Sequence, residues 1–161
     1  MTREEYIRKN LKWPLTWEVF FMRYLIVLIM IGITISSFVS LIEKDYQESN
    51  IILFILGLSL FLFAFIRIQS ERHFRRLKLN PNIKFKDIRK KLDSLDLINL
   101  QTESEKIEFL DKVCFLSGGV YVTIIKYDDN NILINTRPFG KQPFTINRDR
   151  VNYKRIKTLL Q

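Results

Sequence analysis

Histidine and cysteine are almost absent from this chain, which has one residue of each among 161. The single cysteine, Cys114, excludes an internal disulfide and suits a reducing compartment. The single histidine, His73, lies among arginines and has neither an acidic partner nor a metal-ligand spacing around it. Asp128 and Asp129 are adjacent acids, but such pairs between two strands are usually turn formers. We therefore predict a non-catalytic protein with no metal site and no cofactor.

Charged residues are missing from two long apolar runs, Tyr24–Ile42 and Ile51–Ile66. A helix rises about 1.5 Å per residue, so the first run spans about 28 Å, close to the roughly 30 Å of a bilayer's hydrocarbon core. Backbone groups that lack hydrogen-bond partners do not cross lipid, so both runs must be helical. We predict transmembrane helices at about 24–42 and 50–68, joined as an antiparallel hairpin.

Basic residues flank these runs on both sides, whereas the polar stretch between the runs contains a single basic residue, Lys44. The N-terminal flank carries Arg3, Arg8, Lys9, Lys12 and Arg23, and the chain as a whole has a net charge of +9. Basic flanks of membrane helices stay in the cytoplasm. This pattern predicts an integral protein of the bacterial inner membrane whose N-terminus and C-terminus are both cytoplasmic.

The second flank is predicted to continue the second helix as a basic juxtamembrane helix up to residue 79, because no glycine or proline interrupts it before Pro81. Each base near an anionic leaflet contributes about 1 kcal/mol of binding. Membrane lipids are therefore expected partners, and the candidate lipid-binding residues are Arg67, Arg72, Arg75, Arg76 and Lys78. The alternative is that these bases only fix the topology.

The first residues also predict a helix at the membrane. Thr2 followed by Glu5 is a capping-box pattern that starts a short helix through about Asn10. Its mixture of bases and apolar residues suits a helix lying on the membrane surface. Trp13 and Trp17 are expected to form an interfacial aromatic belt.

Small residues recur every four positions in the first apolar run, at Gly32, Ser36 and Ser40, and so share one helix face. Small side chains at this spacing let two helices approach closely. The face predicts packing within the hairpin or, alternatively, a homo-oligomer formed between protomers.

Residues 1–79 are thus assigned to a membrane region, and residues 80–161 to a cytoplasmic α+β domain that is expected to fold on its own. Helical spacing predicts a helix over 84–95 and a last helix over 148–160. Between them, alternating and β-branched stretches predict strands near 97–102, 106–110, 120–127 and 132–136, with short segments near 113–116 and 144–146. The resulting fold class is a membrane helical hairpin plus a helix, an antiparallel meander of four or five strands, and a C-terminal helix.

A loop that contains prolines at 138 and 143 carries the candidate interaction residues. Aromatic side chains between bases on a loop are a plausible contact surface for a partner or a headgroup. These residues are Arg137, Phe139, Lys141, Phe144 and Arg148. The alternative is that one phenylalanine covers the core of the sheet and the bases are solvated.

The strand at 132–138, the segment Phe144–Asp149 and the final helix bring out a resemblance. A membrane hairpin with both ends inside, followed by a small strand-rich module that a helix closes, resembles the uncharacterised bacterial membrane proteins of the YcxB-like group, which have PH-like C-terminal domains. The resemblance implies a binding or regulatory module.

The function predicted from the sequence is a membrane-tethered, non-catalytic interaction or regulatory module with an unknown protein partner. The alternative is a module that reads anionic lipid headgroups, and a subunit of a larger membrane complex or an enzyme ranks below both. No nucleic-acid partner is expected, because the bases of the cytoplasmic domain are scattered and follow no recognition motif.

Overall fold

The computed structural model describes residues 2–43, 48–111, 119–138 and 148–161. They form two compact units. The hairpin unit is Leu15–Ser70, and the sheet unit combines Met1–Pro14 with Glu71–Gln161. The boundary predicted between residues 79 and 80 therefore differs from the structure, because both the N-terminal residues and residues 71–79 belong to the sheet unit.

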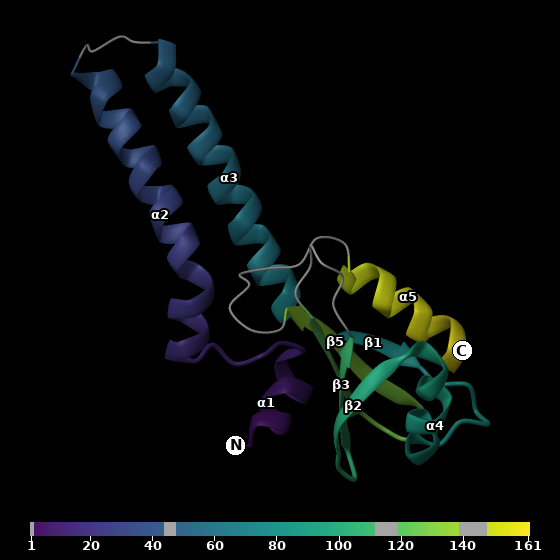
Figure 1. Cartoon of the computed structure of the whole chain (residues 1–161). Coiled ribbons are helices and arrows are strands. Elements are labelled where there is room, and N and C mark those ends of the chain that lie inside the picture. The colour runs from purple at the N-terminus through teal and green to yellow at the C-terminus, as the bar shows by residue number, and fades with distance from the viewer. Residues whose placement is uncertain (1, 44–47, 112–118, 139–147) are drawn as a thin grey trace. The chain divides into compact units, whose positions relative to one another are not determined.

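The hairpin unit consists of α2 (Trp17–Ile42) and α3 (Glu48–Arg72), whose last two residues belong to the sheet unit (Figure 1). The helices run antiparallel, since Gln69 Nε2 donates to the Tyr24 hydroxyl at 2.7 Å near one end and the Phe38 and Phe54 rings lie 5.7 Å apart near the other. Both helices are longer than the predicted spans.

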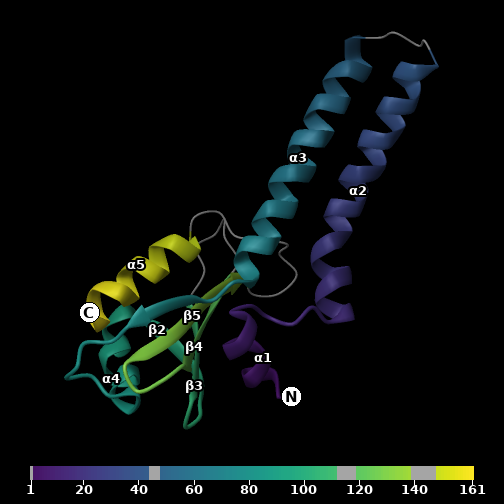
Figure 2. The ribbon, with the colours of Figure 1, turned by 180° about the vertical axis from the view of Figure 1, so that it is seen from behind.

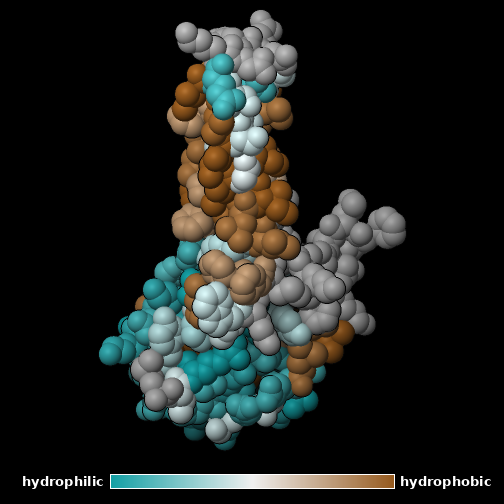
Figure 3. All heavy atoms as spheres, turned by 90° about the vertical axis from the view of Figure 1, so that its left-hand side faces the viewer, coloured by the Kyte–Doolittle hydropathy of each residue, from teal (hydrophilic) through white to brown (hydrophobic). Residues whose placement is uncertain are grey.

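Helix α3 is long and apolar enough over Ser49–Arg72 to cross a membrane, judged by length and composition within the described part of the chain. Only 17% of its most apolar window is buried, whereas the core helix of a soluble protein is mostly buried. Helix α2 contributes a shorter apolar stretch, Val27–Ile42. Figure 3 shows hydrophobic side chains gathered on the outer surface of these helices. Insertion of the whole hairpin remains a proposal.

Small residues pack between α2 and α3, but not those of the predicted stripe. Gly57 lies against Thr34, where an added Cβ would come within 2.8 Å of the hydroxyl oxygen. Ser37 is also buried, whereas Ser36 is exposed and a Cβ on Gly32 would meet no atom within 4 Å. The helix contact therefore uses a different face from the one that carries Gly32 and Ser36.

The sheet unit is built on a five-stranded antiparallel sheet with strand order β1-β5-β4-β3-β2. The predicted meander is confirmed by β2 to β5, and the predicted segments at 113–116 and 144–146 lie outside the described residues. The Asp128 carboxylate accepts a hydrogen bond from the backbone N–H of Asn130 and so shapes the turn between β4 and β5. The strands are β1 (Arg75–Lys78), β2 (Leu97–Thr102), β3 (Lys106–Asp111), β4 (Val120–Lys126) and β5 (Asn131–Pro138).

One face of the sheet is covered by helices (Figure 2). The predicted helix over 84–95 is divided into η1 (Phe85–Asp87), α4 (Ile88–Leu92) and η2 (Asp93–Leu95). The predicted last helix is confirmed as α5 (Arg148–Leu160). Their buried side chains meet those of the strands in the larger core, which includes Leu77, Ile88, Leu92, Ile107, Phe109, Val122, Ile124, Ile132, Ile134, Ile156 and Leu160.

Helix α1 (Arg3–Asn10) packs against the opposite face of the sheet. The capping box of Thr2 and Glu5 is present, but Ile7 is only 1% exposed and packs with Ile125 and Leu133. The prediction that this helix lies on the membrane surface is therefore wrong for its apolar side. Its few apolar residues are used to cover a sheet face that would otherwise expose hydrophobic side chains to water.

The predicted basic helix beyond Arg72 is also wrong. Helix α3 ends at Arg72, and the chain continues as β1, which pairs with β5 in the register Arg75↔Ile134 to Lys78↔Asn131. Leu77 is buried while its neighbours are exposed, which is a strand pattern. Pairing with the edge of the sheet outweighs the helix preference of this segment.

Candidate functional site

The two chain segments that connect the units are paired with each other. Trp13 N donates to Arg72 O at 2.9 Å, and Phe74 N donates to Leu11 O at 2.7 Å. Between these hydrogen bonds, Lys12 forms an antiparallel bridge with His73. We call these paired segments, 11–13 and 72–74, the clamp. The clamp lies within the sheet unit and joins the two segments from which the chain continues into the hairpin unit.

Side chains fix the clamp to β5. Trp13 Nε1 donates to Asn135 Oδ1 at 2.8 Å, and Asn135 Nδ2 donates to the carbonyl oxygens of Glu71 and His73 at 2.8 and 2.9 Å. Arg72 Nη2 donates to the carbonyl oxygen of Trp13 at 2.9 Å. Trp13 is only 5% exposed, so its assignment to an interfacial belt is wrong, whereas Trp17 in α2 is exposed. Buried polar groups satisfied in this way favour one arrangement over others.

Sequence reasoning missed the clamp because its hydrogen bonds join residues about sixty positions apart. Trp13, next to Pro14, was the available signal, since a buried indole needs both apolar cover and a partner for its N–H group.

Arg137 is the described member of the predicted interaction loop, and it lies within the sheet unit. Its guanidinium lies 4.5 Å from the Trp13 ring centroid and 5.1 Å from that of Tyr121. Its Nη2 atom is 3.8 Å from Glu108 Oε1. A guanidinium held between two rings positions the clamp. Phe139, Lys141 and Phe144 lie outside the described residues, as does the side chain of Arg148, which begins α5.

Two of the predicted lipid-binding residues lie on α3, but in different units. Arg67 belongs to the hairpin unit and is half-buried. Arg72 belongs to the sheet unit, where it is buried and contacts the clamp backbone. Burial makes the guanidinium of Arg72 a structural group of the clamp.

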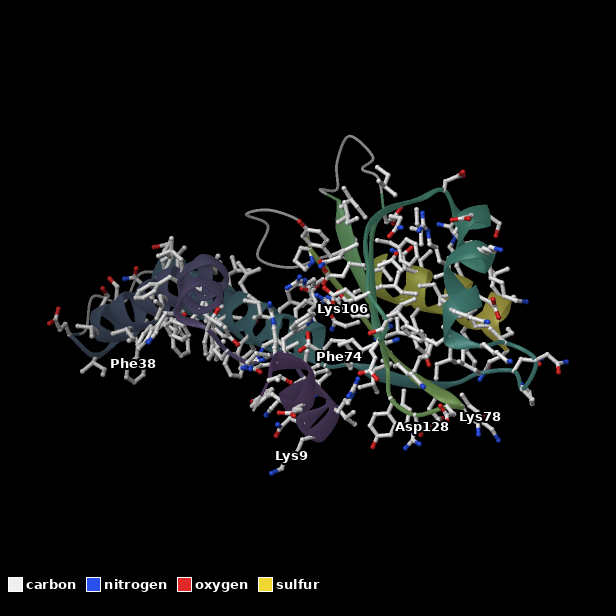
Figure 4. The ribbon with its side chains drawn as sticks, turned by 90° about the horizontal axis from the view of Figure 1, so that it is seen from below. Lys9, Phe38, Phe74, Lys78, Lys106 and Asp128 are labelled. Carbon is white, nitrogen blue, oxygen red and sulfur yellow. The ribbon has the colours of Figure 1, made fainter. Side chains whose placement is uncertain are left out.

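The other three predicted lipid-binding residues lie on β1 and point to different faces of it. The Arg75 guanidinium stacks 5.0 Å from the Tyr153 ring on the α5 side. Arg76 Nη2 forms an ion pair with Asp128 Oδ2 at 3.2 Å across the sheet. Lys78 is exposed, and Figure 4 shows it near Asp128 at one end of the sheet. The basic juxtamembrane helix predicted to carry all five bases therefore does not form, because α3 ends at Arg72 and Arg75–Lys78 is a strand.

Ion pairs and hydrogen bonds also fix α1 and the turns. The Arg8 guanidinium hydrogen-bonds to Glu105 and donates to the Lys126 carbonyl, which ties α1 to the ends of β3 and β4. This Arg8 contact holds the pKa of Glu105 below its usual value. The hydrogen bond from Asn131 similarly lowers the pKa of Asp128. Both carboxylates therefore stabilise the sheet unit while they are ionised.

Strand β2 forms an edge of the sheet and exposes apolar side chains. Ile98 is 37% exposed and Leu100 is 47% exposed. A bulge between Asn99 and Gln101 leaves Leu100 opposite no residue of β3. The strand contains no charged residue and no proline, which are two of the features that protect edge strands from pairing.

Nothing in the described residues resembles a metal centre, since no group of three or more His, Cys, Asp or Glu side chains is gathered there. Comparison with known proteins finds no family model, no curated protein and no solved structure that matches this chain.

Proposed function

We propose that this protein is a membrane-tethered binding module: the hairpin unit anchors it in the bacterial inner membrane, and the cytoplasmic sheet unit binds a protein partner without catalysing a reaction. The observation that carries this proposal is the apolar, exposed surface of α3. Only 17% of the most apolar window of this helix is buried. Such a surface is stable in lipid and costly in water. The resemblance to the YcxB-like group agrees with a binding role.

The clamp supports the proposed topology. Residues 1–14 and 71–161 form one compact unit, so both ends of the hairpin must leave from the same side of a membrane. The intervening segment then crosses an even number of times, which fits two spans. The basic residues on both flanks favour the cytoplasm as this common side.

The exposed edge at β2 is the proposed surface for the partner. Acidic residues bracket its apolar side chains, with Asp96 before Leu97 and Glu103 after Thr102. A second copy paired antiparallel would bring Asp96 of one chain near Glu103 of the other, which is repulsive. The chemistry instead fits a different protein that presents an apolar side chain between lysines or arginines.

Site-specific photocrosslinking in cells tests this proposal. A photoreactive amino acid at Ile98 should give an adduct of one discrete mass in the membrane fraction, and the same group at the exposed Thr158 of α5 should not. Replacing Asp96 and Glu103 with lysine should abolish the adduct, because the bracketing charge is reversed. Equal labelling from both positions, or an adduct that survives the charge reversal, would remove β2 as the binding surface.

A further inference from the structure

Two basic side chains lie next to each other in the clamp. The hydrogen bonds Trp13 N to Arg72 O and Phe74 N to Leu11 O flank the Lys12–His73 bridge, which makes these two residues a non-hydrogen-bonded antiparallel pair. In such pairs the Cα atoms are about 4.5 Å apart and the two side chains share one side of the ladder. The neighbouring Trp13 and Phe74 are buried with Ile7, Ile125 and Leu133 in a second, smaller core, and Figure 4 shows Phe74 beside α1.

A third base follows on the same side of the chain. Arg75 is two residues beyond His73, and side chains two positions apart in an extended segment point the same way. Its guanidinium lies 5.0 Å from the Tyr153 ring centroid, which limits the directions it can take. His73 is exposed and Lys12 is half-exposed. The register therefore gathers an ammonium, an imidazole and a guanidinium on one side of the clamp.

Chain connectivity alone places these bases at the height of lipid headgroups if the hairpin spans a membrane. His73 directly follows α3 and lies five residues after Ile68, which is the end of the predicted span. Five residues of helix rise about 8 Å, and a headgroup layer is about 5–8 Å thick in each leaflet. The bases are thus within side-chain reach of the lipid phosphates.

We propose that Lys12, His73 and Arg75 form a binding site for the phosphate group of an anionic membrane lipid. All three side chains can carry N–H donors, and the arginine presents a planar pair of N–H groups that suits phosphate oxygens. This site rests on the proposed insertion of the hairpin, and it shares only Arg75 with the five lipid-binding bases predicted from the sequence.

Native mass spectrometry of the full chain in detergent tests the site. Phosphatidylglycerol should be retained in preference to phosphatidylcholine with the same acyl chains. Lys12→Gln and His73→Gln should each weaken retention about fivefold, the effect expected for one base near an anionic headgroup. Lys154→Gln on the exposed surface of α5 is the matched control and should change nothing. The conservative Lys12→Arg should keep the preference.

Two outcomes overturn the site while leaving the tether intact. One is unchanged lipid retention by a variant that combines Lys12→Gln with His73→Gln, when the chain still resists extraction by alkaline carbonate. The other is complete displacement of phosphatidylglycerol by millimolar inorganic phosphate, which would assign the bases to free phosphate. If carbonate extracts the unaltered chain, the proposed insertion and this lipid site both fail.

Discussion

Removing the hairpin unit from the chain should leave a folded sheet unit. The change joins Pro14 to Glu71 through a short glycine-serine linker, so that both parts of the sheet unit stay in one polypeptide. The linker needs little length, because Trp13 and Arg72 already share a backbone hydrogen bond of 2.9 Å. We expect the fusion to unfold in a single cooperative transition, since its two cores are complete.

A fragment that begins at residue 80, the boundary predicted from the sequence, should behave differently. It lacks five apolar side chains of the sheet unit that are at most 5% exposed: Ile7, Trp13, Phe74, Leu77 and Leu79. Burial of each contributes about 2 kcal/mol, so the fragment loses on the order of 10 kcal/mol. A domain of this size is stable by only about 5–15 kcal/mol in total, and we expect the fragment not to fold cooperatively.

Urea unfolding followed by circular dichroism compares the two proteins directly. The fusion should show a sigmoidal transition, whereas the fragment should show a gradual change or precipitate. Fusion variants with Ile7→Ala or Trp13→Ala should fall between them, each losing about 2–5 kcal/mol. If the fragment unfolds at the same urea concentration as the fusion, α1 and β1 add nothing to stability and this account of the second core is refuted.

Three further predictions concern the membrane, acid and the helix contact. In a chain whose Cys114 is changed to serine, a cysteine that replaces Glu43 should react with a membrane-impermeant thiol reagent in intact cells. A cysteine placed in α5 should not react. The reverse labelling pattern would contradict the proposed topology. The contact with Arg8 lowers the pKa of Glu105, so it stabilises the sheet unit at pH values above the ordinary carboxyl pKa. This stabilisation is lost as the pH falls through the lowered pKa of Glu105. Glu105→Gln should therefore reduce the loss of thermal stability on acidification, as measured by calorimetry. Gly57→Leu should weaken the hairpin by about 1–3 kcal/mol because its side chain meets α2. Gly32→Leu should spare the hairpin and, if protomers associate through that face, abolish crosslinked dimers in membranes.

Local sequence signals were sufficient for the meander and the last helix. Alternating residues predicted β3 within one residue of its observed end, and the acidic and amide residues at 128–131 marked the turn between β4 and β5. Helical spacing predicted α5, in which Ile156 and Leu160 are buried in the larger core, whereas Val151 is exposed. These elements are specified by residues close to one another in the chain.

The errors arose where distant partners decide the structure. Residues 75–78 contain no helix breaker, so a helix was the simplest local prediction, but β5 offers them an edge to pair with. The surface of α1 is polar enough for a membrane interface, yet Ile7 meets residues more than a hundred positions away. Arg137 was assigned to an exposed loop because the sequence gives no sign that Trp13 and Tyr121 flank it.

The contact between Arg8 and the Lys126 carbonyl also sets an order of events during synthesis. These residues are 118 positions apart, so α1 leaves the ribosome well before the sheet face that it covers exists. At about 5–20 residues per second, the delay is on the order of ten seconds. The hairpin is made during that interval, with the apolar side of α1 still uncovered. If the hairpin inserts in a membrane, an N-terminus left on the opposite side from residues 71–161 would be lost to the sheet unit, so the fold selects against an odd number of crossings.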